Sequence, residues 1–200
     1  MASMVKTPPR ISLNSRKARG IAYLLAYIAC IPIANWMIGH VGTECLPRGP
    51  CLLPVWPWAP GGALMAPSGV VMVGLALVLR DLVQRRLGRA AALLAIVAGA
   101  ALSGAVAPPA LVVASTAAFF LSELANFAVY TPLAARGLVK AVLASSLVGL
   151  LADSVLFLWL AFGSLEFLAG QVVGKTWMVL LALPLIHWIR QRETASDIAP

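Results

Sequence analysis

Four ionisable residues, Asp81, Glu123, Asp153 and Lys175, lie within or at the edge of long apolar runs of this sequence. A charged side chain near the middle of a bilayer costs about 2.5–3.5 kcal/mol on insertion scales. Such residues rarely face lipid, and instead they pair with one another, line a watery cavity or bind a polar solute. We therefore predict that these four residues mark a pathway or a binding pocket inside a helical bundle.

The run that contains Glu123 also carries polar and aromatic residues at helical spacing. On one helix face this spacing gathers Phe119, Glu123, Asn126, Phe127 and Tyr130. A carboxylate accepts two parallel N–H bonds, an amide both donates and accepts, and a ring covers the face of a solute. The stripe predicts a pocket for a flat, neutral, hydrogen-bonding solute. The alternative is that Glu123 only ties its helix to a neighbour.

Two later runs add polar groups to this pocket. Asp153 lies near the middle of its run, where a carboxyl group should be paired or protonated. Lys175 lies one helical turn after Gln171, and we interpret it as the only cation well inside a span, with Asp153 or Glu123 as its partner. A purely structural Asp–Lys bridge is the alternative. A protonatable carboxyl beside a lysine is also what proton-coupled transport needs, so Asp153 and Lys175 are candidates for coupling.

Arg80 and Asp81 end the second apolar run and are followed by Gln84 and Arg85. We predict a salt bridge between Arg80 and Asp81 at the cytoplasmic edge of the membrane. Asp81 is also a candidate for gating or coupling at the inner end of the pathway.

The composition identifies the class of protein. Of the 200 residues, 61% are hydrophobic and 11% are charged, whereas a soluble domain carries about 25% charged residues. The chain is therefore predicted to be an integral membrane protein in contact with the lipid bilayer. The formal net charge is +8, but the basic residues cluster in short segments between apolar runs. That distribution is typical of topology signals, so no binding of nucleic acid is expected.

Apolar runs of roughly 17–25 residues predict an all-α fold, a single bundle of six transmembrane helices. The helices are expected near residues 21–39, 63–84, 90–106, 109–132, 138–162 and 167–189. Ala107-Pro108-Pro109 separates the third from the fourth, and we favour a tight turn over one kinked helix, which would leave five spans. The predicted organisation is a basic tail (1–20), the transmembrane domain (21–190) and a C-terminal tail (191–200).

The positive charges orient this bundle. With six spans, the basic clusters all fall on one face, and they consist of Lys6, Arg10, Arg16, Lys17, Arg19, Arg85, Arg86, Arg89, Arg136, Lys140, Arg190 and Arg192. The opposite face carries only Arg48, with Glu44 and Glu166. Because cytoplasmic loops carry the excess of Lys and Arg, both termini are predicted to be cytoplasmic in a multi-pass protein of the inner (plasma) membrane.

The segment 40–62 between the first two spans is rich in Pro, Gly and Trp. Trp56 and Trp58 are expected in the outer interfacial belt, although this segment could alternatively form a lid over the pocket.

The same segment contains Cys45 and Cys51. If it is extracytoplasmic, these two residues can form a disulfide. No metal site is expected, because only His40 and Glu44 are nearby as further ligands.

Catalysis is not expected. An intramembrane serine protease needs a Ser nucleophile and a His base within hydrogen-bonding reach. His40 and His187 lie at opposite ends of the predicted bundle, and Ser68 lies a membrane thickness from His187. The sequence contains no His-Glu-x-x-His motif, phosphate-binding Gly loop or nucleophile elbow, and we predict neither enzymatic activity nor a cofactor.

Taken in order, several of these residues resemble the queuosine precursor transporter family, also called the vitamin uptake transporter family. The resemblance covers about residues 30 to 180, and its most specific part is Asp153-Ser154 followed by Lys175. The other matching positions are Asn35, Pro67-x-Gly69, Asp81, Gly88, Glu123-x-x-Asn126, Tyr130, Ala144-Ser145-Ser146, Ala152 and Phe157.

The resemblance implies a six-helix importer of 7-deazaguanine precursors of the tRNA base queuosine, such as 7-cyano-7-deazaguanine. A guanine-like edge presents adjacent N–H donors to a carboxylate, and its bicyclic ring offers a face for stacking. The match implies substrate-binding roles for Asn35, Glu123, Asn126, Asp153 and Lys175.

Two other classes of function remain open at this point. One is a substrate-capture subunit of an energy-coupling vitamin transporter, which would need a separate ATPase because the chain has no nucleotide-binding motif. The other is a membrane scaffold that transports nothing. The sequence also leaves open whether the protein forms a homo-oligomer.

Overall fold

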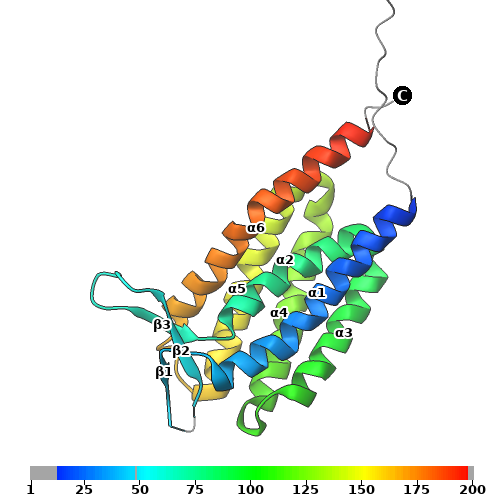
Figure 1. Ribbon diagram of the computed structural model, residues 1–200. Coiled ribbons are helices and arrows are strands. Elements are labelled where there is room, and N and C mark those ends of the chain that lie inside the picture. Colours follow the sequence, from blue (N-terminus) through cyan, green and yellow to red (C-terminus); the bar gives the residue numbers. More distant parts are fainter. Residues whose placement is uncertain (1–12, 48, 198–200) are drawn as a thin grey trace, which may run out of the picture.

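The computed structural model describes residues 13–47 and 49–197, which form one bundle of six α-helices with a small sheet at one end (Figure 1). The helices are α1 (Leu13–His40), α2 (Val70–Leu87), α3 (Arg89–Val106), α4 (Val112–Leu133), α5 (Leu138–Phe162) and α6 (Leu168–Asp197). The strands are β1 (Glu44–Cys45), β2 (Cys51–Trp56) and β3 (Leu64–Pro67), and single 3₁₀ turns precede α4 (Pro109–Leu111) and α5 (Ala134–Arg136).

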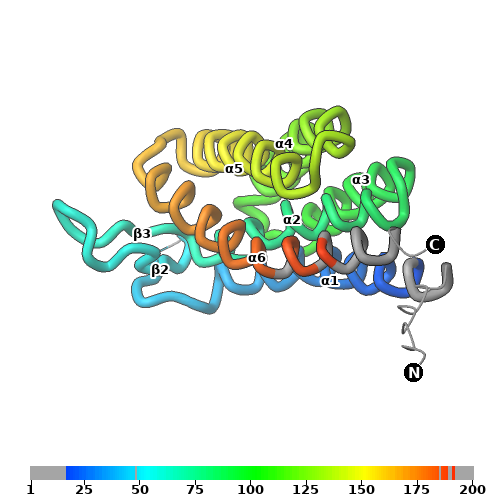
Figure 2. The backbone as a smooth tube through the Cα atoms, turned by 90° about the horizontal axis from the view of Figure 1, so that it is seen from above, coloured from blue at the N-terminus to red at the C-terminus, as the bar shows by residue number. Residues whose placement is uncertain are grey.

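Within the described residues, five helices are long and apolar enough to cross a membrane, and α2 is not among them. The sequence of α2 carries four charged residues in its second half, namely Arg80, Asp81, Arg85 and Arg86. This helix lies at the centre of the bundle, where it packs against each of the other five helices (Figure 2). Because its surroundings are protein rather than lipid, α2 can carry charges that a lipid-facing helix could not.

The six predicted helices are present, although their bounds differ from the prediction. The expected start of the second helix at residue 63 is wrong, because residues 64–67 form β3 and α2 begins at Val70. Two helices are longer than predicted: α1 begins at Leu13, and α6 continues to Asp197. Hydropathy defines the part of a helix that fits a membrane, whereas helix-forming residues continue the same helix beyond it. Residues 1–12 of the predicted tail and Arg48 lie outside the described residues.

The turn between α3 and α4 agrees with the prediction of two separate helices. Ala107 and Pro108 both adopt extended backbone conformations, with ψ angles of 145° and 140°. A residue that precedes proline is disfavoured in the helical region, so the Pro108-Pro109 pair ends α3. The alternative that merged these two segments into one kinked helix is therefore wrong.

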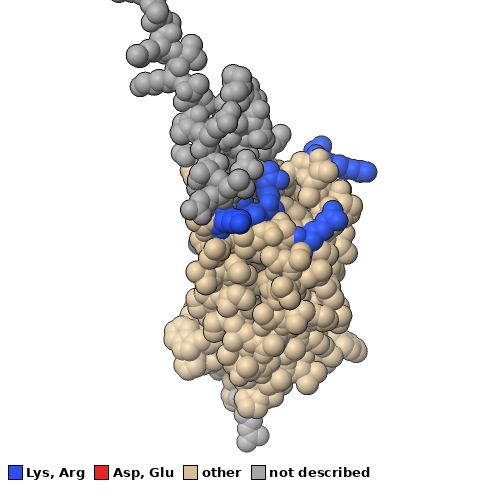
Figure 3. Space-filling model, turned by 90° about the vertical axis from the view of Figure 1, so that its right-hand side faces the viewer, with Lys and Arg blue, Asp and Glu red and all other residues tan. Residues whose placement is uncertain are grey.

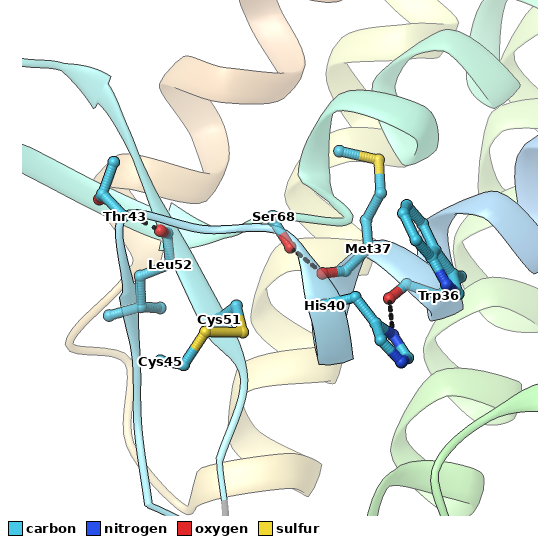
Figure 4. Close-up of a disulfide and its surroundings, with 8 residues drawn as sticks. All are labelled: Trp36, Met37, His40, Thr43, Cys45, Cys51, Leu52 and Ser68. Atoms are coloured by element: carbon cyan, nitrogen blue, oxygen red, sulfur yellow. Dashed lines mark hydrogen bonds between the residues drawn. A yellow bond between two sulfur atoms is a disulfide. The ribbon is translucent and has the colours of Figure 1, made fainter.

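The all-α prediction is wrong for the segment after α1, which forms an antiparallel sheet in the order β1-β2-β3. Cys45 pairs with Cys51 across β1 and β2, and the two residues form a disulfide (Figure 4). The sheet is attached to the bundle, because the Ser68 hydroxyl donates to the Met37 carbonyl of α1 at 2.7 Å (Figure 4). Prolines concealed this sheet in the sequence, since Pro54 lies at an irregularity of the β2–β3 ladder, where proline is tolerated.

The outward faces of the helices are apolar, as expected for a protein surrounded by lipid. Large exposed hydrophobic side chains include Leu25 on α1, Leu94 on α3, Trp159 on α5 and Leu181 on α6. The buried interior, in contrast, contains an unusual number of polar and charged side chains. This inversion of the soluble pattern supports burial of the helices in a membrane.

Charge is distributed unequally between the two ends of the bundle. The sheet lies at one end, and the start of α1 and the end of α6 lie at the other (Figure 1). On the face shown in Figure 3, the basic side chains gather at the end where α1 begins, and the remaining described surface visible on that face shows no charged side chain.

Candidate functional site

Buried polar side chains form two clusters inside the bundle. The first, which we call the lysine cluster, consists of Ser122, Asp153, Ser154, Gln171 and Lys175. The second, which we call the arginine cluster, consists of Arg80, Asp81, Gln84, Glu123 and Ser145.

In the lysine cluster, the side chain of Lys175 is 1% exposed and all three donors of its ammonium group have partners. The Nζ atom donates to Asp153 Oδ2 at 2.6 Å, to Gln171 Oε1 at 2.6 Å and to Ser154 Oγ at 2.8 Å. Of the two partners considered for Lys175, the structure thus selects Asp153 over Glu123. One buried cation and one carboxylate balance each other in charge.

Helix geometry explains why these groups meet. Gln171 and Lys175 lie four residues apart on α6, so their side chains share one face. That face approaches α2 closely at Gly74, where an added Cβ would lie 2.9 Å from the Cα and carbonyl oxygen of Lys175. The absence of a side chain at Gly74 therefore sets the distance between α6 and the centre of the bundle.

In the arginine cluster, one guanidinium group faces two carboxyl groups. Arg80 and Asp81 are both 0% exposed, and Arg80 Nη2 forms an ion pair with Asp81 Oδ1. Arg80 Nε lies 3.3 Å from Glu123 Oε2, close enough for an ion pair but without hydrogen-bond geometry. Arg80 Nη1 donates to Gln84 Oε1 at 2.7 Å, and Ser145 Oγ donates to Asp81 Oδ2 at 2.7 Å.

Aromatic rings complete the surroundings of Arg80. Its guanidinium carbon lies 5.7 Å from the ring centre of Phe127 and 5.6 Å from that of Tyr130, within the range of cation–π attraction. Both rings come from α4, the helix that also supplies Glu123. The stripe predicted on this helix therefore exists, and several of its members surround an arginine.

Two predictions about charge need correction. The Arg80–Asp81 salt bridge is present, but it is fully buried instead of lying at an exposed membrane edge. Lys175 is consequently not the only cation inside the bundle. The sequence placed Arg80 near the end of an apolar run, and only the central position of α2 buries it.

The two clusters are joined through consecutive residues of α4. Ser122 Oγ donates to Asp153 Oδ1 at 3.4 Å, whereas Glu123 pairs with Arg80. Glu123 also lies within electrostatic range of Asp153. A change of charge at one cluster can therefore affect the other cluster over a short distance.

A cavity lies beside the lysine cluster and leaves about 60 Å³ for the centres of water molecules. Helices α1 to α6 and the segment before α2 all contribute to its wall. The residues with hydrogen-bonding side chains in this wall are Asn35, Ser103, Ser115, Asp153, Gln171 and Lys175, and the rings are those of Phe119 and Phe157.

Two amides in the cavity wall retain unused hydrogen-bonding capacity. Asn35 Nδ2 donates to Ile31 O at 3.0 Å, whereas the buried Asn35 Oδ1 has no partner among the described residues. Gln171 uses its oxygen as an acceptor for Lys175, which leaves its NH₂ group as a donor. The wall thus offers a free acceptor and a free donor to a bound molecule.

Some of the predicted site residues line this cavity, and the others lie outside its wall. Asn35, Asp153, Gln171 and Lys175 line the cavity, whereas Glu123, Asn126, Phe127 and Asp81 are not among its lining residues. Asn126 donates instead to the carbonyl oxygen of Leu77 on α2 at 3.3 Å.

Arg80, Gln84 and Ser145 were not predicted as site residues. For Arg80 a signal existed, because ten uncharged residues precede it in α2.

Comparison with known proteins gives one match. Residues 103–189 match the model of a family described as "Putative vitamin uptake transporter". Searches of curated proteins and of solved structures return no match. The matched segment contains α4 and α5, the part of α6 that carries Gln171 and Lys175, and all of the lysine cluster. Over these residues the chain is therefore similar to the vitamin uptake transporter family, also called the queuosine precursor transporter family, a family of membrane transporters of small molecules.

Proposed function

We propose that this protein imports a queuosine precursor, 7-cyano-7-deazaguanine or a similar deazapurine, across the inner membrane. The observation that carries this proposal is the cavity between the helices, whose wall combines two amides that retain unused hydrogen-bonding atoms, a carboxylate and two aromatic rings. This combination suits a flat solute with hydrogen-bonding groups along one edge.

The chemistry of the wall suggests a division of roles. Asn35 Oδ1 and Asp153 Oδ1 would accept the adjacent N–H bonds of a guanine-like edge, and the Gln171 NH₂ group would donate to its carbonyl oxygen. The rings of Phe119 and Phe157 would cover the bicyclic face. Lys175 would hold Asp153 and Gln171 in position through its two 2.6 Å hydrogen bonds.

In the proposed cycle, Glu123, Asn126 and Phe127 act deeper in the protein. Glu123 and Phe127 both contact Arg80, and Asn126 joins α4 to α2. These residues would transmit binding at the cavity to the arginine cluster, and transport would depend on them.

The cavity must enlarge during transport. A volume of about 60 Å³ holds roughly four to six water molecules, at about 10–15 Å³ each, and a bicyclic solute is larger. Pro32 lies within the cavity-lining stretch of α1 and cannot donate the backbone hydrogen bond expected there. Bending of α1 at Pro32 is therefore a local movement that could open the cavity.

The charge distribution supports an orientation of the protein in the membrane. The basic side chains gather at the end of the bundle where α1 begins, and a cytoplasmic location of that end agrees with the preference of Lys and Arg for this side. The solute would then enter from the end that carries the sheet.

Binding of 7-cyano-7-deazaguanine to the purified protein tests this proposal. In a thermal-unfolding assay, a ligand at 100 times its dissociation constant adds about 2.7 kcal/mol to the unfolding free energy. We expect a shift with this deazapurine and none with biotin.

The variant Asn35→Leu should bind the deazapurine at least about tenfold more weakly, because about 1.4 kcal/mol is lost with the hydrogen bond. Glu166→Gln, which alters an exposed side chain outside the cavity, serves as the control. A folded protein that shows no shift with the deazapurine would contradict the proposal.

The family description, which names vitamin uptake, favours a second candidate: a substrate-capture subunit of an energy-coupling vitamin transporter. This function requires a separate ATPase partner. Copurification with an ATPase, or uptake that stops on ATP depletion but survives collapse of the proton gradient, would favour it over independent import.

A further inference from the structure

The two clusters differ in their balance of charge. In the lysine cluster one ammonium group faces one carboxylate. In the arginine cluster the single guanidinium of Arg80 faces both Asp81 and Glu123. All three of these side chains are at most 2% exposed, so water does not screen the surplus carboxyl group.

Among the described residues, Arg80 is the cation that acts on both of these carboxyl groups. Glu123 interacts electrostatically with Arg80 and with two further carboxyl groups, those of Asp81 and Asp153. Asp81 interacts electrostatically with Arg80 and accepts a hydrogen bond from Ser145. The buried Tyr27 of α1 also lies within electrostatic range of Glu123. The next cation along α2, Arg85, is exposed and interacts with Tyr130.

An uncompensated charge in a protein interior is costly, and a carboxyl group avoids that cost by binding a proton. Two carboxyl groups that share one site hold the first proton as a pair, so the proton belongs to both groups and not to one residue alone. Glu123 Oε2 has no hydrogen-bond partner among the described residues and is free to carry it.

We propose that the arginine cluster holds one proton, shared between Asp81 and Glu123, and that this proton is the coupling ion of the transport cycle. The balanced Asp153–Lys175 pair, in contrast, binds the solute and holds no exchangeable proton. The coupling role rests on the proposed function, whereas the protonation of the cluster stands on its charge balance alone.

Consecutive residues of α4 link the protonation of the arginine cluster to the binding of the solute. Ser122 contacts Asp153 in the cavity wall, and Glu123 contacts Arg80. A solute that donates hydrogen bonds to Asp153 reduces the repulsion between this carboxylate and Glu123. The proton then leaves the carboxyl O–H for water, and Glu123 remains as a carboxylate paired with Arg80. Loss of the proton and occupation of the cavity would thus favour each other.

Infrared spectroscopy of the purified full-length protein at neutral pH tests the protonation directly. A protonated carboxyl group absorbs separately from a carboxylate, and we expect one such band in the unaltered protein. Both Glu123→Gln and Asp81→Asn should abolish the band, because each leaves Arg80 balanced by one carboxylate. The exposed control Glu166→Gln should keep it.

Absence of the band from the unaltered protein would overturn the proposal, as would its persistence in either cluster variant or its loss in the Glu166→Gln control. If Asp81→Asn does not fold, Glu123→Gln carries the test.

Transport measurements in proteoliposomes then test coupling. Because binding of the solute releases the proton, the unaltered protein should accumulate 7-cyano-7-deazaguanine against its gradient in proteoliposomes whose lumen is more acidic than the outside. Asp81→Asn should still exchange the solute across the membrane, but its accumulation driven by the pH gradient should fall at least tenfold.

If Asp81→Asn accumulates as much solute as the unaltered protein does, the coupling role is overturned. If the unaltered protein neither binds nor exchanges the solute, the proposed function fails, and the infrared result still decides whether the cluster holds a proton.

Discussion

The lysine cluster and the arginine cluster are built from similar groups but differ in their balance of charge and in their position relative to the cavity. Lys175 satisfies all its donors with three partners beside a cavity, whereas Arg80 is shared by two carboxyl groups away from it. A balanced ion pair with complete hydrogen bonds is rigid, and therefore suits the positioning of a solute. A cluster with one surplus carboxyl group can change its protonation state, and therefore suits coupling.

The largest effect should follow from removal of the cation of the lysine cluster. Lys175→Met leaves Asp153 buried without a counter-charge, and breaking a buried ion pair costs about 3–5 kcal/mol. Denaturant unfolding of the purified protein should show this loss, and the exposed control Lys140→Met should change stability little. A loss below about 1 kcal/mol would mean that Lys175 is dispensable for packing.

The next prediction compares the removal of one carboxyl group from each cluster. Asp153→Asn leaves the ammonium of Lys175 uncompensated and should cost about 3 kcal/mol. Glu123→Gln preserves the Arg80–Asp81 pair and should cost about 1 kcal/mol, the value of a typical hydrogen bond. Equal losses in the two variants would show that the clusters do not differ in charge balance.

Gly74 offers a way to disturb the lysine cluster without touching its polar groups. An added methyl group would press against the backbone of α6 at Lys175, and overpacking of this kind costs about 1–3 kcal/mol. Gly74→Ala should therefore lower both stability and solute affinity. Gly39→Ala is the matched control, because no atom lies within 4 Å of its added methyl group. Similar behaviour of the two variants would argue against close α2–α6 contact at Lys175.

The smallest effect concerns the link between the clusters. Ser122→Ala removes the long 3.4 Å hydrogen bond to Asp153 and should cost about 0.5 kcal/mol, at the low end for a hydrogen bond. If α4 transmits binding to the arginine cluster, the same variant should reduce uptake driven by a pH gradient by more than it reduces binding. Equal reductions would separate the two clusters functionally.

Much of the fold was accessible from the sequence, because bilayer thickness and hydropathy determine where helices can form. The Pro108-Pro109 turn was predicted correctly, since proline restricts the residue before it. The sheet was missed, because its short strands contain prolines and are stabilised by contacts with α1 and α6. The central position of α2 was also missed, since no local pattern records which helix the other five surround.

For the candidate site too, some features could be predicted from the sequence and others only from the tertiary structure. The sequence alone identified Asp153 and Lys175 as buried ionisable groups, because the cost of a charge in an apolar run is a local property. It could not choose between Asp153 and Glu123 as the partner of Lys175, nor bring Arg80 into the interior. Those outcomes depend on which helix faces meet, and only the tertiary structure decides that, because the free energy of a buried charge is set by neighbours distant in sequence.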